Sequence, residues 1–450
     1  MLSGGVRGVE GRAYTQAGIW DEKLFRMLSG AVRALPAERI NLKDIAELVL
    51  AFHKIQVPRS SHAGQTGATG QTGQTAQGGR PGTRPSCSLA ACVQTRSGSH
   101  LRDGALFMRM SAVVKSREIS ALAAEPRAVA NIVNAFAKAQ IWDEELFRRL
   151  SRAARMAQPR RLSVTDCAVI VASFAKAQSR DGARLRDGAL FRRMSLIVQS
   201  RRVEDFSARS VANIAAAFAH AGVWDRALFG RMARTAMRLG RPPLPFAPPS
   251  AAPSPLANFK HQELASIAWA VAKAGVEGAE SGGAERNREQ AQSRDRAFFS
   301  LLAQELTSRG ISGFKPQELS NLLWALTSAV HTEARPLALF TMVEAELTER
   351  DLARFNPQDL SNLATSLAAF GAPASSRSLP LGLAAVAAEM LRPESGSNGS
   401  NDRKLRLAAF TPGQLSAVRP AQRRSCFPLC VSAPQGLSHR PASGLSARLC

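Results

Sequence analysis

Apolar residues recur at helical spacing through most of this chain, and the hydrophobic pattern itself repeats. The line Phe-Lys-Pro-Gln-Glu-Leu-Ser-Asn-Leu at Phe314–Leu322 returns 41 residues later as Phe-Asn-Pro-Gln-Asp-Leu-Ser-Asn-Leu at Phe355–Leu363. Looser copies begin at Phe206, Phe259 and Phe410. A fixed period of about 40 residues is typical of stacked supersecondary units, each too small to bury its apolar face alone.

Each repeat is predicted to contain two helices. The first half opens with an Asp and a Leu-Phe or Phe-Phe pair, and we expect the Asp to cap the helix by accepting from free backbone N–H groups. A later pair, Leu339-Phe340, has no such Asp. The Asp residues that begin the predicted first helices are Asp21, Asp103, Asp143, Asp187, Asp225 and Asp295.

The second half of each repeat begins with a Phe, and a Leu or Val follows five positions later. This spacing predicts a hydrophobic staple across the start of a helix. Pro316, Pro357 and Pro412 then fall at the first helical position, where a missing N–H costs nothing. Asn356 with Asp359, and Thr411 with Gln414, have capping-box spacing. The predicted staple pairs are Phe206/Val211, Phe259/Leu264, Phe314/Leu319, Phe355/Leu360 and Phe410/Leu415.

These signals together predict an all-α fold, an α-solenoid of stacked antiparallel helix pairs. The segments 58–100 and 416–450 are rich in Gly, Pro, Ser, Thr or Gln, and we expect them to be disordered. The predicted organisation is a partial repeat (1–57), a low-complexity linker (58–100), basic helical repeats (101–240), a Pro-rich linker (241–257), helical repeats (258–415) with polar insertions at 276–293 and 391–404, and a tail (416–450).

The net charge of the chain adds an expectation about its binding partner. The net charge of +24 and a pI near 11.2 favour a polyanion, and nucleic acid before a membrane. The charge is uneven: residues 142–241 hold 20 Lys and Arg against 9 Asp and Glu, a net of +11, whereas residues 293–371 hold 7 against 9, a net of −2. The basic character therefore belongs to the middle repeats and is not a general property of the architecture.

The same sequence gives little sign of other chemistry. No apolar run is long enough to cross a membrane. The histidines show no metal-ligand spacing, and neither a metal nor a cofactor is predicted. No Ser-His-Asp set, carboxylate pair or phosphate-binding Gly-rich loop stands in a usable context, so we predict no enzyme and no small-molecule substrate. Cys167 lies on an apolar helix face and is expected in the core.

Arginines on the predicted first helices of the middle repeats are the main candidate binding residues. Spacings of three, four and seven residues place them on shared helix faces. Stacked side by side, such helices would present guanidinium groups to a sugar-phosphate backbone. The alternative is a solvated outer face. The candidates are Arg148, Arg152 and Arg155 in one helix, Arg192 and Arg193 in the next, and Arg231, Arg234 and Arg238 in the third.

An asparagine recurs at one position of the predicted second helices, at Asn131, Asn213, Asn321 and Asn362. Its amide could read a base edge. The alternative is a hydrogen bond to backbone between repeats inside the core, which the flanking Ile, Leu and Ala residues favour. Trp269 and Trp324 also recur at one position, and we expect both in the core.

The repeat lines resemble known organellar helical-repeat families. The resemblance rests on Pro316–Leu326, Pro357–Leu363 and Gln262–Ala270, and is strongest over 258–371. These residues look like octotricopeptide and heptatricopeptide repeat proteins of algae and apicomplexan-type protists, related in pattern to FAST-kinase-like mitochondrial proteins and to kinetoplastid RNA-editing substrate-binding proteins. Many family members end in a RAP domain with a nuclease-like fold, and we find no convincing one in this sequence.

The resemblance implies a function as well as a fold. It implies an α-solenoid that binds single-stranded organellar mRNA or rRNA, with other ribonucleoprotein subunits as further partners. The implied roles are RNA processing, stability, editing or ribosome assembly, in the mitochondrial matrix or alternatively the plastid stroma. The competing hypothesis from the repeats alone is an armadillo/HEAT-like scaffold that binds proteins and has no direct contact with RNA.

Overall fold

The computed structural model of this chain describes residues 22–52, 103–177, 187–239, 254–277, 285–329, 337–370, 381–390 and 410–411. These residues form sixteen α-helices, joined in places by short 3-10 turns, and no strand. The all-α prediction is therefore confirmed for this part of the chain. The chain divides into two compact units, Met1–Ala334 and Arg335–Cys450.

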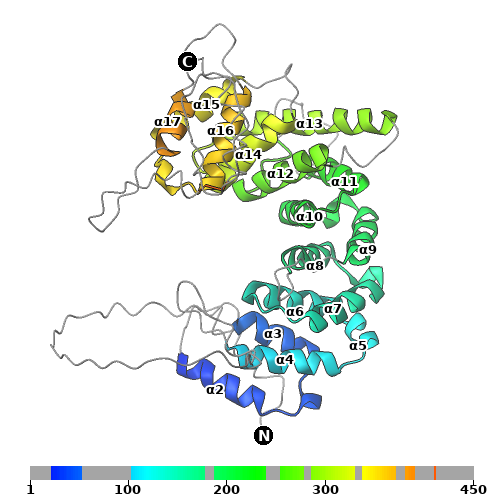
Figure 1. The fold of residues 1–450 in the computed structure, drawn as a ribbon. Coiled ribbons are helices and arrows are strands. Elements are labelled where there is room, and N and C mark those ends of the chain that lie inside the picture. Colours follow the sequence, from blue (N-terminus) through cyan, green and yellow to red (C-terminus); the bar gives the residue numbers. More distant parts are fainter. Residues whose placement is uncertain are drawn as a thin grey trace, which may run out of the picture. The chain divides into compact units, whose positions relative to one another are not determined.

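The first unit consists of alternating first and second helices (Figure 1). A turn, which is the short helix α5 (Ile119–Ala124) in one repeat, separates several pairs. The first helices are α2 (Glu22–Arg33), α4 (Gly104–Ser116), α7 (Glu144–Met156), α9 (Gly188–Gln199), α11 (Arg226–Ala236) and α13 (Glu285–Arg309). The second helices are α3 (Leu42–Phe52), α6 (Pro126–Ala139), α8 (Val164–Lys176), α10 (Ala208–Ala221), α12 (His261–Glu277) and α14 (Pro316–Ala329).

Helices of the same kind pack on one another in chain order. Among the second helices, α6 contacts α3 and α8, α10 contacts α8 and α12, and α12 contacts α14 (Figure 1). Among the first helices, α7 contacts α4 and α9, and α11 contacts α9 and α13. The pattern of contacts is the same from one repeat to the next, so that each repeat covers the apolar face of its neighbour.

An aromatic pair joins the two helices within three of the repeats. Phe107 and Phe136 have ring centroids 5.1 Å apart, and Phe191 and Phe218 5.0 Å apart, both edge to face. Phe147 and Phe174 form the same contact at 5.5 Å. Edge-to-face packing is favourable beyond the area that it buries. The Phe residues of these three first-helix Leu-Phe pairs are thus core residues.

The predicted staples are buried at both ends. Phe206, Phe259, Phe314 and Phe355 are each at most 5% exposed, as are the Val or Leu residues five positions later. The capping box at Asn356 is confirmed, because its Oδ1 accepts from the Asp359 N–H at 2.9 Å and Asp359 Oδ2 accepts from the Asn356 N–H at 3.4 Å. Phe410 is buried as well, but the ends of its predicted staple and capping box, Leu415 and Gln414, lie outside the described residues, as does Pro412.

The Asp caps of the first helices are confirmed in four repeats and wrong in one. Oδ1 of Asp103, Asp143, Asp187 and Asp225 accepts from the N–H of the Leu three residues later. Asp295 does not begin its helix, because α13 starts at Glu285. No Pro or Gly interrupts the chain between these positions, so the predicted polar insertion at 276–293 is helical from Glu285 onward. Asp21 lies outside the described residues.

The second unit has three described helices, α15 (Leu337–Glu349), α16 (Pro357–Phe370) and α17 (Leu381–Met390), and a turn at Leu352–Arg354. The helix α17 packs on both α15 and α16. Its Gly382 permits a close approach, because a Cβ added there would lie 3.3 Å from Glu344 Cα. The predicted linker 58–100, the insertion 391–404 and the tail 416–450 lie outside the described residues.

Candidate nucleic-acid interface

The arginines of the first helices occupy two positions with different surroundings. An arginine directly after the Phe of the Leu-Phe pair, as at Arg148 and Arg192, is exposed. The next residue, as at Arg109, Arg149 and Arg231, is half-buried and donates across the repeat boundary. Arg109 Nη2 lies 3.1 Å from Leu35 O and Arg149 Nη2 lies 2.6 Å from Arg117 O, while Arg231 donates to Arg201 O. These acceptors all stand just after the previous first helix.

A further arginine at the end of the first helix is tied to the turn of the previous repeat. Arg117 donates to Ala37 O at 2.9 Å and to Ile40 O at 2.8 Å. Arg201 contacts Pro159 O and Leu162 O in the same way, with 2.7 Å to the latter. In both cases the two carbonyls stand three residues apart. A guanidinium group suits this role because its fork of donors is planar and always charged.

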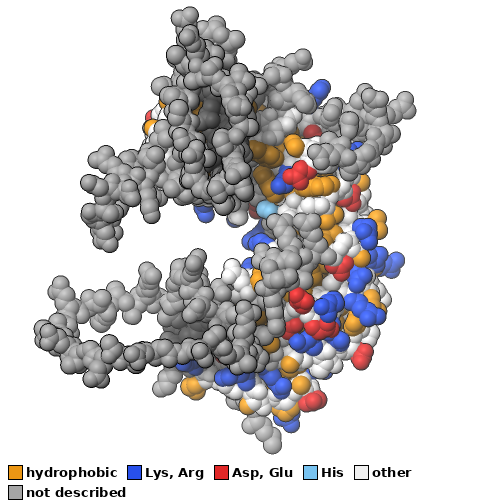
Figure 2. Space-filling model, in the orientation of Figure 1, with side chains coloured by type: hydrophobic (Ala, Val, Ile, Leu, Met, Phe, Trp, Pro, Cys, Tyr) orange, Lys and Arg blue, Asp and Glu red, His pale blue; other side chains and the backbone are white. Residues whose placement is uncertain are grey.

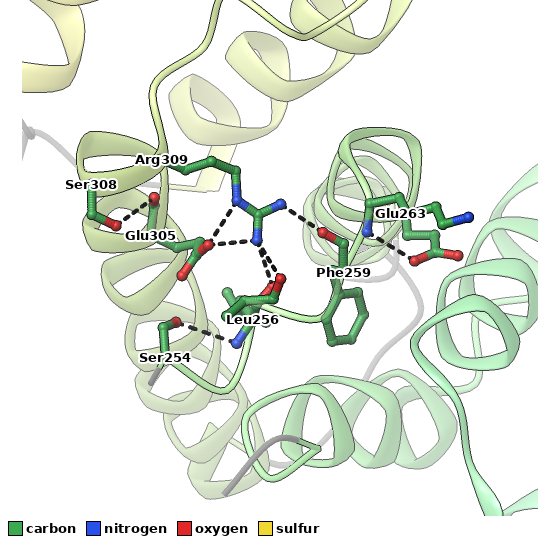
Figure 3. Close-up of polar contacts among 9 residues, drawn as sticks. Ser254, Leu256, Phe259, Glu263, Glu305, Ser308 and Arg309 are labelled. Carbon is green, nitrogen blue, oxygen red and sulfur yellow. Dashed lines mark hydrogen bonds and ion pairs between the residues drawn. The ribbon is translucent and has the colours of Figure 1, made fainter. Parts of the chain in front are cut away.

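Arg309 repeats this contact in α13, as Figure 3 shows. Its Nη1 lies 2.6 Å from Phe259 O, and its Nη2 lies 3.0 Å from Leu256 O. Glu305, four residues earlier, accepts from Arg309 Nε at 2.8 Å and fixes the side chain. The chain thus uses part of its positive charge to join repeats, and these arginines are not available to a ligand.

An Asp–Ser contact links the first helices as well. The Oδ2 atom of each capping Asp accepts from a buried Ser of the previous first helix, as in Ser111 to Asp143 at 2.6 Å. Lys115 reaches the same carboxylate at 2.7 Å. Burial raises the pKa of Asp143, but the hydrogen bonds from Lys115, Ser111 and the Leu146 N–H, together with the charge of Lys115, outweigh it and leave the pKa below its ordinary value. The other Ser–Asp contacts are Ser29–Asp103, Ser151–Asp187 and Ser195–Asp225.

The predicted arginine rows therefore contain residues with different roles. Arg155 lies beside the Asp187 carboxylate, with its Nε 3.6 Å away, at the position equivalent to Lys115. Arg148 is 67% exposed, yet it pairs with Glu144 at 3.6 Å and with Glu145 in its own helix. The half-buried members are Arg155, Arg193 and Arg231, and the exposed members are Arg148, Arg152, Arg192, Arg234 and Arg238. Figure 2 shows basic and acidic side chains interspersed over α7 and α9 at the right-hand edge.

A second accessible surface runs over the second helices and was not predicted as a whole. If the residue before each second helix is numbered 0, the residues at positions 2, 6, 9 and 13 of that helix lie on one face. We call these positions on α6, α8, α10, α12 and α14 the second-helix stripe. All are half-buried or exposed, whereas intervening residues such as Ile132, Ile214 and Leu322 are buried. The members are Arg127, Asn131, Asn134 and Lys138; Thr165, Val169, Ala172 and Lys176; Arg209, Asn213, Ala216 and His220; Gln262, Ser266, Trp269 and Lys273; and Gln317, Asn321, Trp324 and Ser328.

The charge of the second-helix stripe has one sign. From α6 to α12 its outer positions, 2 and 13, include five Lys or Arg residues and one His, and no stripe position on these four helices is Asp or Glu. The preceding helix α3 differs, since it carries Lys43 at position 2 and Glu47 at position 6. The cationic residues are Arg127, Lys138, Lys176, Arg209 and Lys273, together with His220.

The recurring asparagines belong to this stripe or to its equivalent in α16. Asn213 is exposed, and Asn131, Asn321 and Asn362 are half-buried. Asn362 Oδ1 accepts from Gln358 Nε2 at 2.8 Å within the same helix. None of the four amides bonds to another repeat within the described part of the chain, so the interpretation of these residues as core hydrogen-bonding groups is wrong.

The two tryptophans occupy position 9 of the stripe, and the prediction that both lie in the core is also wrong. Each is half-buried. The Trp269 ring lies 4.6 Å from the His220 ring at a tilt of 33°, and Lys273 Nζ lies 5.1 Å from its centroid. In contrast, Cys167 is buried as predicted, and burial raises the pKa of its thiol to about 12.

Other chemistry finds little support in the described residues. They contain no group of three or more His, Cys, Asp or Glu side chains placed to hold a metal ion. Within the same ranges, no helix is long and apolar enough to cross a membrane. Comparison of the whole chain with known protein families and with curated proteins gives no match. The resemblance to organellar repeat proteins therefore remains a prediction from the sequence.

Proposed function

We propose that this protein is an α-solenoid that binds single-stranded RNA along its second-helix stripe. The observation that carries the proposal is the charge of that stripe, which is cationic from α6 to α12 and free of Asp and Glu. Neutralising phosphates releases their counterions, and this release is the main source of affinity for nucleic acid. The overall charge of +24 agrees with such a partner.

The inner positions of the stripe favour a single strand over a duplex. On α6, α10, α12 and α14 at least one of positions 6 and 9 carries an amide or aromatic side chain, such as Asn131, Asn213, Trp269 and Trp324, whereas α8 carries Val169 and Ala172 there. The amide and aromatic groups can hydrogen-bond to base edges and stack on base faces, which a duplex hides and a single strand exposes. Cations outside and base-contacting groups inside are the arrangement that a single strand requires.

Repetition of the same contacts supports the solenoid. The arginine–carbonyl and Asp–Ser contacts occur at successive boundaries of the first unit, each between one repeat and the next. Since nearest-neighbour contacts of this kind fix each repeat relative to the previous one, they generate a regular stack. The octotricopeptide-like lines of the sequence add the organellar setting, with the mitochondrial matrix first and the plastid stroma as the alternative.

A salt series tests the proposal. The full chain is titrated against a labelled single-stranded RNA by fluorescence anisotropy at several salt concentrations. We expect log Kd to rise linearly with log salt, with a slope of about 0.7 for each phosphate neutralised. A duplex of the same sequence serves as the competitor and should bind more weakly. Absence of RNA binding at low salt would reject the proposal.

The protein-scaffold alternative rests on a different observation. Leu196 in α9 and Met156 in α7 are 65% and 56% exposed. Single exposed apolar residues are common on proteins and form no patch by themselves. RNA affinity that is absent, or that does not depend on salt, would favour this alternative.

A further inference from the structure

The α14 end of the second-helix stripe differs from the rest, because it has no charge. Its four members are Gln317, Asn321, Trp324 and Ser328. The neighbouring helix α12, on which α14 packs, still carries the cation Lys273 at position 13. The stripe thus changes from cationic groups to an amide and an indole ring, which suits contact with a base better than contact with a phosphate.

Asn321 and Trp324 stand three residues apart on one helix and therefore on the same face, with about 5–6 Å between Cβ atoms at this spacing. Both side chains are half-buried. Leu322, Leu323 and Leu326 are buried on the opposite face and hold the helix against its neighbours. The pair is therefore presented from a rigid element and not from a loop.

The two tryptophans of the stripe are not equivalent. Trp269 is stacked with His220 and lies near Lys273, so its ring already has partners. The Trp324 ring has no aromatic or cationic partner among the described residues, and the Asn321 amide has no hydrogen bond there. A flat apolar surface with an amide beside it, both accessible and unpartnered, is suited to a planar ligand with polar edges.

We propose that Trp324 and Asn321 form a subsite for one unpaired nucleobase. The base stacks on the indole ring, and the amide donates to and accepts from the base edge. This inference rests on the RNA-binding function proposed above and adds where the chain contacts a base. The cations from α6 to α12 hold the backbone, and α14 holds a base of the same strand.

The test uses the full chain, single-stranded oligoadenylate and oligouridylate as probes, and variants that keep the charge. Trp324→Leu retains an apolar side chain and helix propensity but removes the flat ring. We expect at least a fivefold loss of affinity, the lower end of the effect of losing one base–aromatic stack. Trp324→Phe should recover most of the affinity, and Asn321→Ala should weaken binding severalfold. The salt slope should stay unchanged in all three, because no cation is removed.

Trp142→Leu provides the matched control. Trp142 precedes α7, packs on Phe147 with ring centroids 5.7 Å apart, and lies off the stripe. It should leave RNA affinity within about twofold, since no base contact is lost. Wild-type affinity in Trp324→Leu, or an equal loss in Trp142→Leu, would overturn the subsite while leaving the salt-dependent RNA binding of the wild type intact. Failure of the wild type itself to bind RNA would reject both proposals.

Discussion

Adjacent arginines on a first helix can have different roles, depending on which face of the helix each occupies. Arg148 is exposed and pairs with Glu144 and Glu145 of its own helix, whereas Arg149 donates to the carbonyl of Arg117 in the previous repeat. The sequence shows both as members of one basic run. Only the position relative to the buried Phe147 separates them, because the helix turns about a quarter of a circle per residue.

A neighbouring pair at Arg201 and Arg202 tests this division. Arg201→Gln removes donors from two carbonyls, those of Pro159 and Leu162, and we expect a loss of roughly 2 kcal/mol in the free energy of unfolding. Arg202→Gln removes a side chain that is 83% exposed and pairs with the exposed Glu204, and should change stability by less than about 0.5 kcal/mol. Urea denaturation compares the two. Equal midpoints would show that the contact across repeats contributes nothing.

The capping Asp143 should make stability depend on acid. The pKa of its carboxyl is lowered in the folded state, so its contribution is present above the unfolded pKa of about 3.9 and is lost as pH falls through the folded pKa. Asp143→Asn should therefore destabilise the protein at neutral pH and flatten the fall of stability in acid. Denaturation from about pH 6 to about pH 2 measures this.

Asp44 gives the control of opposite sign. Burial and the nearby Glu47 raise the pKa of Asp44, so its ionised form is disfavoured in the folded state. Asp44→Asn should then cost less stability at neutral pH than Asp143→Asn does. The same acid profile in both variants would contradict the assignment of the Lys115 and Ser111 contacts to the behaviour of Asp143.

At the scale of elements, local signals were reliable and contacts across repeats were not foreseen. Four of the Asp caps, the staples at Phe314 and Phe355 and the box at Asn356 depend on residues close in sequence, and so their spacing predicted them, whereas the cap expected at Asp295 was wrong. The arginine–carbonyl contacts join residues tens of positions apart, such as Arg201 and Leu162. The sequence did contain one signal for these arginines. The pair Glu305 and Arg309 recurs 41 residues later as Glu346 and Arg350, and both pairs form ion pairs within their helices.

The accessible face of the second helices was misjudged for a physical reason. Each second helix packs on two neighbouring second helices and on a first helix, so most of its surface is apolar. The accessible face that remains is only one residue wide per turn. The apolar residues next to Asn213 and Trp324 in the sequence therefore do not show that these two side chains lie in the core. Knowing which neighbours cover which sides requires the packing of α10, α12 and α14, which the periodicity of a single helix does not contain.

The staple at the start of α16 makes a prediction about an element. Phe355→Ala removes a ring that is 1% exposed and should cost at least about 3 kcal/mol in the free energy of unfolding. Asn356→Ala removes one cap hydrogen bond and should cost about 1 kcal/mol. Chemical denaturation of the two variants and the wild type gives the order. A larger effect of Asn356→Ala would show that the cap, and not the buried ring, fixes the start of the helix.

At the scale of the whole molecule, positive charge is divided between joining repeats and facing solvent. Arg117, Arg201 and Arg309 belong to the first class. The solvent-facing class lies on two surfaces. On the first helices it is mixed with Asp and Glu, as Figure 2 shows over α7 and α9. No position of the second-helix stripe from α6 to α12 is acidic, although its Lys273 pairs with Glu277 beside the stripe at 3.3 Å. A long-range field toward a polyanion depends on this difference, because nearby opposite charges cancel it.

Two variants with the same loss of charge separate these surfaces. Arg127→Gln, Lys176→Gln and Arg209→Gln together remove three exposed cations from the second-helix stripe. If each neutralises one phosphate, the log–log salt slope of RNA binding should fall by about 2, and affinity at low salt should fall with it. Thermal stability should scarcely change, because surface substitutions of this kind cost at most about 0.5 kcal/mol each.

The matched variant carries Arg148→Gln, Arg152→Gln and Arg192→Gln, three exposed positions on α7 and α9. We expect a smaller change in salt slope, since Arg148 already faces Glu144 and Glu145 and its removal frees those carboxylates. Both proteins have the same net charge, so a nonspecific effect of charge would lower affinity equally in the two. A larger loss of RNA affinity in the first-helix variant would place the RNA over the arginine rows and away from the second-helix stripe. The base contacts proposed for α14 would then be rejected as well, because the bound strand would not pass over them.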